Sequence, residues 1–159
     1  MNLRRLRIAL PLVLLASMLA AAPAAPAAAD TITVVQRQTD ANPGQTNPCT
    51  GAPGTIVDDE QDLFHITVRP DGILEVSGHN TTAVTFVPDD PNGVSYSGRE
   101  TSNLSATGSG DTFTTTFTTH LRVRGSDGSF VTFREVVHLT VTTAGATVAF
   151  DRPTMACSS

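Results

Sequence analysis

The stretch Thr112–Arg124, with the sequence TFTTTFTTHLRVR, decides the predicted fold class of this chain. One set of alternate positions holds all of its apolar side chains, and the other set holds only threonine, histidine and arginine. The set that contains the apolar side chains consists of Phe113, Thr115, Phe117, Thr119, Leu121 and Val123. Because successive side chains of a β-strand point to opposite faces of a sheet, this period of two predicts a long strand with one buried face and one solvent-exposed face.

A second long strand is expected from Ser129 to Thr143, after the turn-forming residues Ser126-Asp127-Gly128. Its inward set is predicted to be Val131, Phe133, Glu135, Val137, Leu139 and Val141. Aligning the apolar sets of the two strands places Val123 opposite Val131, Leu121 opposite Phe133, and Phe113 opposite Val141. A shift of one residue would turn every side chain to the other face, so the pattern constrains this register.

The segment before this hairpin contains further strand patterns. Residues 64–68 and 74–76 flank Pro70-Asp71-Gly72, and their apolar faces match only across a bulged or three-residue turn. Additional strands are predicted at 83–87 and 94–105, and the exported part of the chain has no helical periodicity. Strands of about 12 residues would span about 40 Å if straight, so they are expected to coil and bend.

The predicted fold is therefore all-β, an antiparallel meander of long strands that forms a barrel-like domain. By fold it would be similar to lipocalin-like and cyclase barrels. A β-sandwich is the alternative, because two packed sheets also require strands with one apolar and one polar face.

The first 29 residues are predicted to be a signal peptide. Arg4, Arg5 and Arg7 form a basic start, an apolar run covers 8–19, and small residues lead to a cleavage site near Ala29. The apolar run is shorter than the roughly 20 residues that a membrane-spanning helix needs. The protein is therefore expected to be secreted, with no membrane span in the mature chain.

Three parts of the chain are expected: the signal peptide at 1–29, an N-terminal strand with an irregular segment at 30–54, and the antiparallel β domain at 55–159. Within the middle part, residues 31–36 are predicted to form a short strand. Residues 39–54 are rich in proline, glycine, asparagine and glutamine, and are predicted to be irregular.

Charge and composition exclude several functions. Three of the ten basic residues lie in the signal peptide, which leaves seven against 15 acidic residues and a formal charge of −8. Such a surface repels phosphate backbones, so no nucleic-acid partner is expected. The chain has no lysine, which excludes Schiff-base catalysis and a phosphate-loop lysine. The acidic runs at 58–62 and 89–90 lack the ligand spacing of a calcium loop and are expected to be solvated, with calcium binding as the weaker alternative.

Cys49 and Cys157 are the two cysteines of the chain and lie near the ends of its exported part. In an oxidising compartment such a pair is expected to form a disulfide bond. The weaker alternatives are free thiols and a metal site with two cysteine ligands.

The residues around these cysteines carry a resemblance. Asn47-Pro48-Cys49-Thr50-Gly51, the segment His138-Leu139-Thr140-Val141 before a glycine turn, and the final Cys157 resemble a family of uncharacterised secreted bacterial β proteins. The composition, with arginine as the only strongly basic residue and much alanine and threonine, is similar to that of actinobacterial proteins. The chain departs from the family pattern at Asp58–Asp62, where the strand begins with more acidic residues. The resemblance implies an exported β domain with this disulfide and no established activity.

Glu135 is the first candidate ligand-binding residue, because it falls on the predicted inward face opposite Thr119. If Val148 pairs with Val141 across the turn at 144–145, Arg152 lies diagonal to Glu135 on that face. A buried charge needs a partner, so Glu135, Arg152 and Thr119 are predicted to be able to anchor a ligand inside the barrel. The alternative is a structural pair near the barrel mouth, or a bulge that turns Glu135 outward.

His120, Arg122 and Arg134 form the second candidate site, a possible anion-binding patch on the outward face. His120 is predicted to lie opposite Arg134 and beside Arg122. The alternative is that acidic residues of a neighbouring strand offset these charges. The four histidines lack the short spacing of a metal motif, so no metal ligands and no cofactor are assigned.

Three functional classes remain open. The favoured hypothesis is a non-enzymatic exported protein that binds a small apolar or amphipathic molecule in its β-barrel. The alternatives are a secreted surface or interaction protein, for example an inhibitor, with an extracellular protein as its partner, and a small barrel enzyme such as a cyclase or isomerase. No catalytic residue is assigned, because no complete catalytic motif occurs in the sequence.

Overall fold

The structure, a computed structural model, describes residues 29–158. The predicted signal peptide lies outside the described residues except for its last residue. Strand residues make up about three quarters of the described part, and no helix in 29–158 is long and apolar enough to cross a membrane.

The described residues form eight strands in a single antiparallel sheet. In chain order the strands are β1 (Asp30–Thr46), β2 (Pro53–Val68), β3 (Leu74–Pro88), β4 (Tyr96–Ser109), β5 (Thr112–Gly125), β6 (Phe130–Thr142), β7 (Gly145–Asp151) and β8 (Thr154–Ser158). Each of the first six strands pairs with the next one along the chain, and β8 returns to pair with β6 beyond the end of β7. The all-β class and the antiparallel meander of long strands are thereby confirmed.

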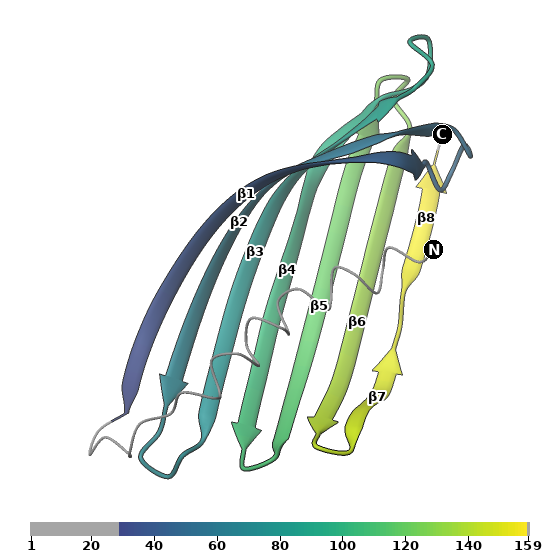
Figure 1. Cartoon of the computed structure of the whole chain (residues 1–159). Helices are drawn as coiled ribbons and strands as arrows, with labels where there is room; N and C mark the ends of the chain where they lie inside the picture. The colour runs from purple at the N-terminus through teal and green to yellow at the C-terminus, as the bar shows by residue number, and fades with distance from the viewer. Residues whose placement is uncertain (1–28, 159) are drawn as a thin grey trace.

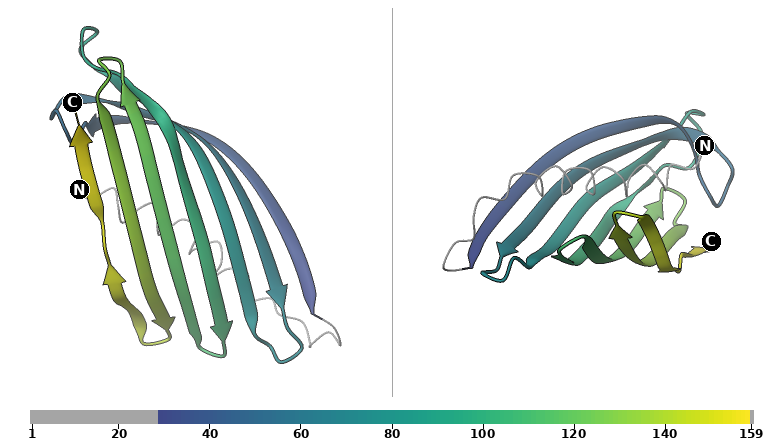
Figure 2. Two further views of the ribbon diagram at one scale, coloured as in Figure 1. Left: turned by 180° about the vertical axis from the view of Figure 1, so that it is seen from behind. Right: turned by 60° about the horizontal axis from the view of Figure 1, so that its bottom comes forward.

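The sheet is strongly curved but is not closed into a barrel. Among the described strands β1 pairs only with β2, and β7 and β8 pair only with β6. Figure 1 and the two views of Figure 2 show an arched sheet in which the upper parts of β1 and β2 bend over toward β8. Strands of 13 to 17 residues from β1 to β6 provide the length that this bending requires.

The predicted register of the β5–β6 hairpin is confirmed. Val123 pairs with Val131, Leu121 with Phe133, Thr119 with Glu135, and Phe113 with Val141. The turn between β2 and β3 is also as expected, since the amide of Arg69 donates to the carbonyl of Ile73 and encloses the three residues 70–72. Alternation of apolar residues was sufficient in both hairpins because a shifted register would have exposed the apolar face.

Two local predictions were wrong. The segment predicted to be irregular at 39–54 continues β1 as far as Thr46, because its backbone groups pair with β2 across a bulge between Asn42 and Gln45. At the other end of the chain, Val148 pairs with Leu139 and not with Val141. A bulge next to Leu139 then places Phe150 opposite His138, on the outward face.

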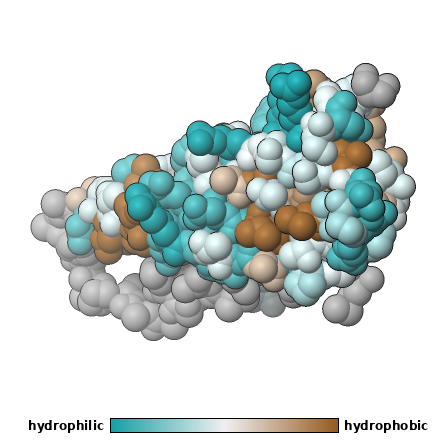
Figure 3. Space-filling view, turned by 90° about the horizontal axis from the view of Figure 1, so that it is seen from above, coloured by the Kyte–Doolittle hydropathy of each residue, from teal (hydrophilic) through white to brown (hydrophobic). Residues whose placement is uncertain are grey.

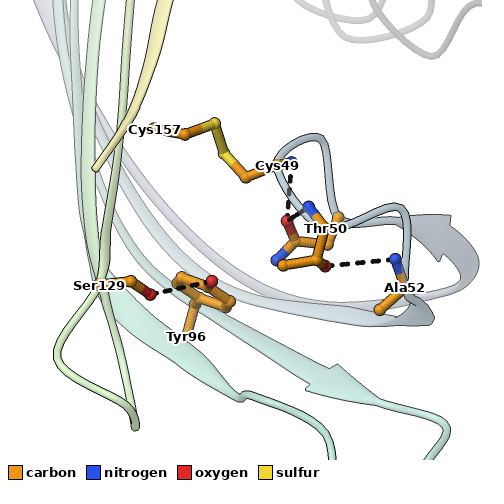
Figure 4. The surroundings of a disulfide bond; sticks show 7 residues. Cys49, Thr50, Ala52, Tyr96, Ser129 and Cys157 are labelled. Carbon is orange, nitrogen blue, oxygen red and sulfur yellow. Dashed lines mark hydrogen bonds between the residues drawn. A yellow bond between two sulfur atoms is a disulfide. The ribbon is translucent and has the colours of Figure 1, made fainter. Parts of the chain in front are cut away.

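A disulfide bond joins the two edges of the arch. Cys49 lies in the connection between β1 and β2, and Cys157 lies in β8, with 5.8 Å between their Cα atoms. Figure 4 shows this bond crossing the gap between the two chain segments. Because Cys157 shares a face with its partner Val131, the bond spans the concave side of the sheet. We call this end the closed end and the opposite end, where β1 and β7 are not connected, the open end.

The hydrophobic core lies at the closed end. Its buried side chains are Val84, Phe86, Tyr96, Val123 and Val131, against which Cys49, Ile56, Val94 and Leu121 pack. Phe86 and Tyr96 meet edge to face with ring centroids 6.5 Å apart. From above this end, apolar residues form patches among polar ones (Figure 3). The disulfide and this cluster together hold the arch closed at one end.

The turn between β5 and β6 is fixed by Ser129. Its amide donates to the carboxylate of Asp127 at 3.0 Å, and its hydroxyl lies 2.6 Å from that carboxylate and 3.0 Å from the Tyr96 hydroxyl. The hydrogen bonds from the Ser129 side chain and backbone hold the pKa of Asp127 below its ordinary value of 3.8.

Replacing both cysteines by alanine is expected to lower the free energy of unfolding by about 2–5 kcal/mol, because the bond closes a long loop of the unfolded chain. Urea denaturation of the oxidised protein and of Cys49→Ala/Cys157→Ala measures this difference. Reduction of the natural protein should give the same shift, and an unchanged denaturation midpoint would contradict the structural role of the bond.

Ser129→Ala is expected to raise the pKa of Asp127 toward its ordinary value, because it removes the main hydrogen bond to the carboxylate. A pKa lowered in the folded state contributes stability above the pKa of the unfolded chain, and this contribution is lost as the pH falls through the folded value. Carboxyl NMR titration checks the shift. Tyr96→Phe is the control, since it removes only the other hydrogen bond of Ser129. An equal pKa for Asp127 in natural protein and Ser129→Ala would refute this account.

Candidate functional site

A continuous row of polar side chains crosses the concave face of the sheet. Cross-strand pairing connects its members one after another, from Gln36 in β1 to Glu135 in β6. The members of this polar row are Gln36, Asp62, Asn80, Ser102, Thr119 and Glu135. Each strand contributes one residue because the side-chain period of two keeps paired residues on a common face.

Hydrogen bonds connect neighbours within the row. The side-chain amide of Asn80 donates to the carboxylate of Asp62 at 2.8 Å, and the hydroxyls of Ser102 and Thr119 lie 3.1 Å apart. Asn80 also donates to Glu60 and accepts a hydrogen bond from Thr82 at 2.9 Å. The row is therefore a preorganised set of donors and acceptors and not a series of isolated side chains.

The row becomes more buried from β1 toward β6. Gln36 is exposed and Asp62 and Asn80 are half-buried, whereas Ser102, Thr119 and Glu135 are 2%, 4% and 8% exposed. Polar groups at such depth cost free energy unless they are hydrogen-bonded. The buried half, at Ser102, Thr119 and Glu135, is the part of the row where a polar group would be held most specifically.

Carboxylates dominate the charge of this part of the concave face. Glu60 and Glu100 belong to the next row toward the closed end, on the two sides of Thr82, and Asp58 lies one row further. No arginine or histidine of β1 to β6 alternates onto the concave face, since the paired registers place these residues on the other side. The site consequently has a negative character that favours hydrogen-bond donors and cations.

Apolar rows lie between the polar row and the open end. The row next to it contains Val34, Phe64, Gly78, Leu104, Phe117 and Val137. The row beyond contains Ile32, Ile66, Val76, Ala106, Thr115 and Leu139. We call these two rows the apolar belt. The concave face is thus divided into an apolar cluster at the closed end, polar residues in the middle and the apolar belt toward the open end.

The structure brings together two of the three predicted ligand-binding residues. Glu135 and Thr119 are direct cross-strand partners on the concave face, as the register predicted. Arg152 is elsewhere: its guanidinium lies 5.3 Å from the ring centroid of Phe150, which stacks on the outward-facing His138. The bulge in β7 is the physical reason, because one additional residue reverses the face of everything that follows it.

The structure also brings together the residues of the predicted anion patch. His120 pairs with Arg134, and Arg122 lies one outward position further along β5. Arg99 of β4 pairs with Arg122 and completes a group that the sequence pattern did not identify. The described residues contain no group of three or more histidine, cysteine, aspartate or glutamate side chains that could hold a metal ion.

Most of the polar row was missed at the level of sequence. Gln36, Asp62, Asn80 and Ser102 are distant in sequence and belong to strands whose register was not predicted. The information was present in the turns, since the three-residue turn at 70–72 fixes β2 against β3 and thereby places Asp62 opposite Asn80. Extending the register one hairpin at a time would have found the row.

Comparison of the chain with protein-family models, with curated proteins and with solved structures finds no match.

Thr119→Val is expected to destabilise the protein by about 1–3 kcal/mol, because the Ser102 hydroxyl loses its buried partner. The double variant Ser102→Ala/Thr119→Val removes both hydroxyls and should be less destabilised than the sum of the single variants. Urea denaturation of the four proteins forms a double-mutant cycle. Strictly additive changes in the free energy of unfolding would show that the two hydroxyls do not interact.

Proposed function

We propose that this protein is an exported, non-catalytic binding protein that holds a small amphipathic molecule on the concave face of its sheet. The apolar part of the ligand lies along the apolar belt, and its polar end meets the buried half of the polar row. Glu135 and Thr119 are the proposed anchors, with Ser102 supporting Thr119.

The observation that carries this proposal is the division of the concave face into zones. A face meant only for packing would be apolar throughout, since each buried polar group needs a partner to offset its desolvation. Here six strands in succession contribute polar side chains to one row, and apolar rows follow immediately. Binding sites for small molecules combine an apolar lining with a few convergent polar groups in this way.

The dimensions of the belt suit an extended ligand. From the polar row to the last paired residues at the open end, Val68 and Leu74, each strand runs six residues. At about 3.3 Å per residue this distance is about 20 Å. An alkyl chain of moderate length that enters at the open end would reach the polar row with its head group.

The polar row favours a positively charged or hydrogen-bond-donating head group. Asp62 and Glu135 in the row, and Glu100 in the row next to it, are acceptors when ionised, and the strand arginines lie on the other face. A carboxylate head group would meet repulsion at the same place. The proposed ligand class is therefore an amphiphile with a cationic or donor head.

Export is part of the proposal. The basic and apolar N-terminal segment predicts a signal peptide, and a disulfide between distant residues is typical of an oxidising compartment.

Alkylamines of increasing length, used below their micelle concentrations, are expected to bind the mature protein in isothermal titration calorimetry. Each CH₂ group buried against the belt contributes about 0.8 kcal/mol, so affinity should rise up to about fourfold per carbon. Glu135→Gln should weaken binding by about tenfold or more, because it removes a charged acceptor.

Glu75→Gln is the matched control, since Glu75 lies on the outward face of β3 and its carboxylate pairs with Arg69 at 3.2 Å. It should bind alkylamines like the natural protein. Equal loss of affinity in the two variants, preference for alkyl carboxylates of the same length, or absence of binding would refute the proposal.

A further inference from the structure

The outward face carries a hollow over β4, β5, β6 and β8. Its volume is about 430 Å³, within the range of small-molecule sites. Arg99, His120, Arg122 and Arg134 line it together with three threonines, Thr101, Thr132 and Thr154. These residues are consecutive cross-strand neighbours, so the register of the sheet assembles them in one place.

The charge of this hollow is opposite to that of the whole protein. The chain has a formal charge of −5, yet no aspartate or glutamate alternates onto the outward face of β4, β5, β6 or β8 in the described residues. Arg69 in the β2–β3 turn, in another part of the sheet, forms ion pairs with Asp71 and Glu75. The alternative that acidic residues of a neighbouring strand offset the patch is therefore not observed on these strands.

Like charges are placed directly opposite each other here, which costs free energy. Arg99 faces Arg122 in the pairing of β4 with β5. Such cross-strand pairs are destabilising unless something between them relieves the repulsion. The guanidinium of Arg122 also lies over the ring of Phe130, 5.0 Å from its centroid, a favourable contact that places it beside the hollow.

The lining combines the two group types that bind oxyanions. Guanidinium groups donate paired hydrogen bonds to phosphate-type oxygens, and threonine hydroxyls add single donors from the side. Thr101 and Thr132 lie next to His120 and Arg122 in the pairing, and Thr154 lies opposite Arg134. Donors thus surround the hollow on each of its four strands.

We infer that this hollow is a binding site for a phosphate-type oxyanion, separate from the concave face and independent of the ligand proposed there. The anion stabilises the arrangement of Arg99, Arg122 and Arg134 by compensating their repulsion. The chemistry is the same for a free phosphate and for the phosphate of a lipid head group, and the experiment distinguishes these two sources.

The test compares the mature natural protein with Arg99→Gln/Arg122→Gln and with Arg37→Gln. Arg37 is the matched control, an exposed arginine on the outward face of β1 that pairs with Gln61. The probes are inorganic phosphate, followed by amide NMR shifts, and vesicles of phosphatidylcholine with or without phosphatidylglycerol, followed by sedimentation. All measurements are made at low ionic strength, because salt screens exposed charges.

Phosphate is expected to shift the amides of β4, β5, β6 and β8 and to raise the melting temperature of the natural protein. The double variant should bind at least tenfold more weakly, and Arg37→Gln should remain within twofold of the natural protein. Without phosphate, the melting temperature of Arg99→Gln/Arg122→Gln should be no lower than that of the natural protein, because the two substitutions remove a repulsive pair. This result would exclude misfolding as the cause of lost binding.

Binding of free phosphate by the natural protein, lost in the double variant, supports a site for a soluble anion. Binding only to vesicles that contain phosphatidylglycerol, lost in the same variant, supports a site for a lipid phosphate. Absence of binding to both probes, or equal binding by the double variant and Arg37→Gln, overturns the inference.

Discussion

The bond between Cys49 and Cys157 is the constraint on which the rest of the structure depends. Hydrogen bonding alone leaves the sheet open, because β1 and β8 are not paired with each other. The disulfide joins these edges at one end, 108 residues apart in sequence, and the apolar cluster around Tyr96 and Val123 packs beneath it. The disulfide thereby ties the two edges of the curved sheet together at its closed end.

The second organising feature is the separation of charge between the two faces of β4, β5 and β6. Strict alternation sends acidic residues such as Glu100 and Glu135 inward and arginines such as Arg99 and Arg122 outward. Cross-strand pairing aligns these residues in continuous rows, so the charge that each strand places on one side becomes the charge of that whole face. The two proposed sites follow from this one arrangement. The polar row on the concave face favours cationic or hydrogen-bond-donating groups, and the hollow on the outward face favours anions.

Sequence alone predicted the fold class and the β5–β6 hairpin, since apolar side chains such as Phe113 and Val131 occupy only one face in each strand. It also placed Glu135 opposite Thr119 and His120 opposite Arg134. It failed at Arg152, because bulges depend on local backbone strain that side-chain patterns do not encode. It also left the sheet's closure undecided, since pairing of the two edges depends on curvature accumulated over all strands.

Native mass spectrometry of the secreted mature protein, before and after organic extraction, tests the central claim most directly. The account predicts a discrete mass above that of the chain, held without a covalent bond and removed by extraction. This mass would be an amphipathic molecule bound along the apolar belt and the polar row after secretion. The bare mass of the disulfide-bonded chain in both samples would contradict a ligand-binding role for the concave face.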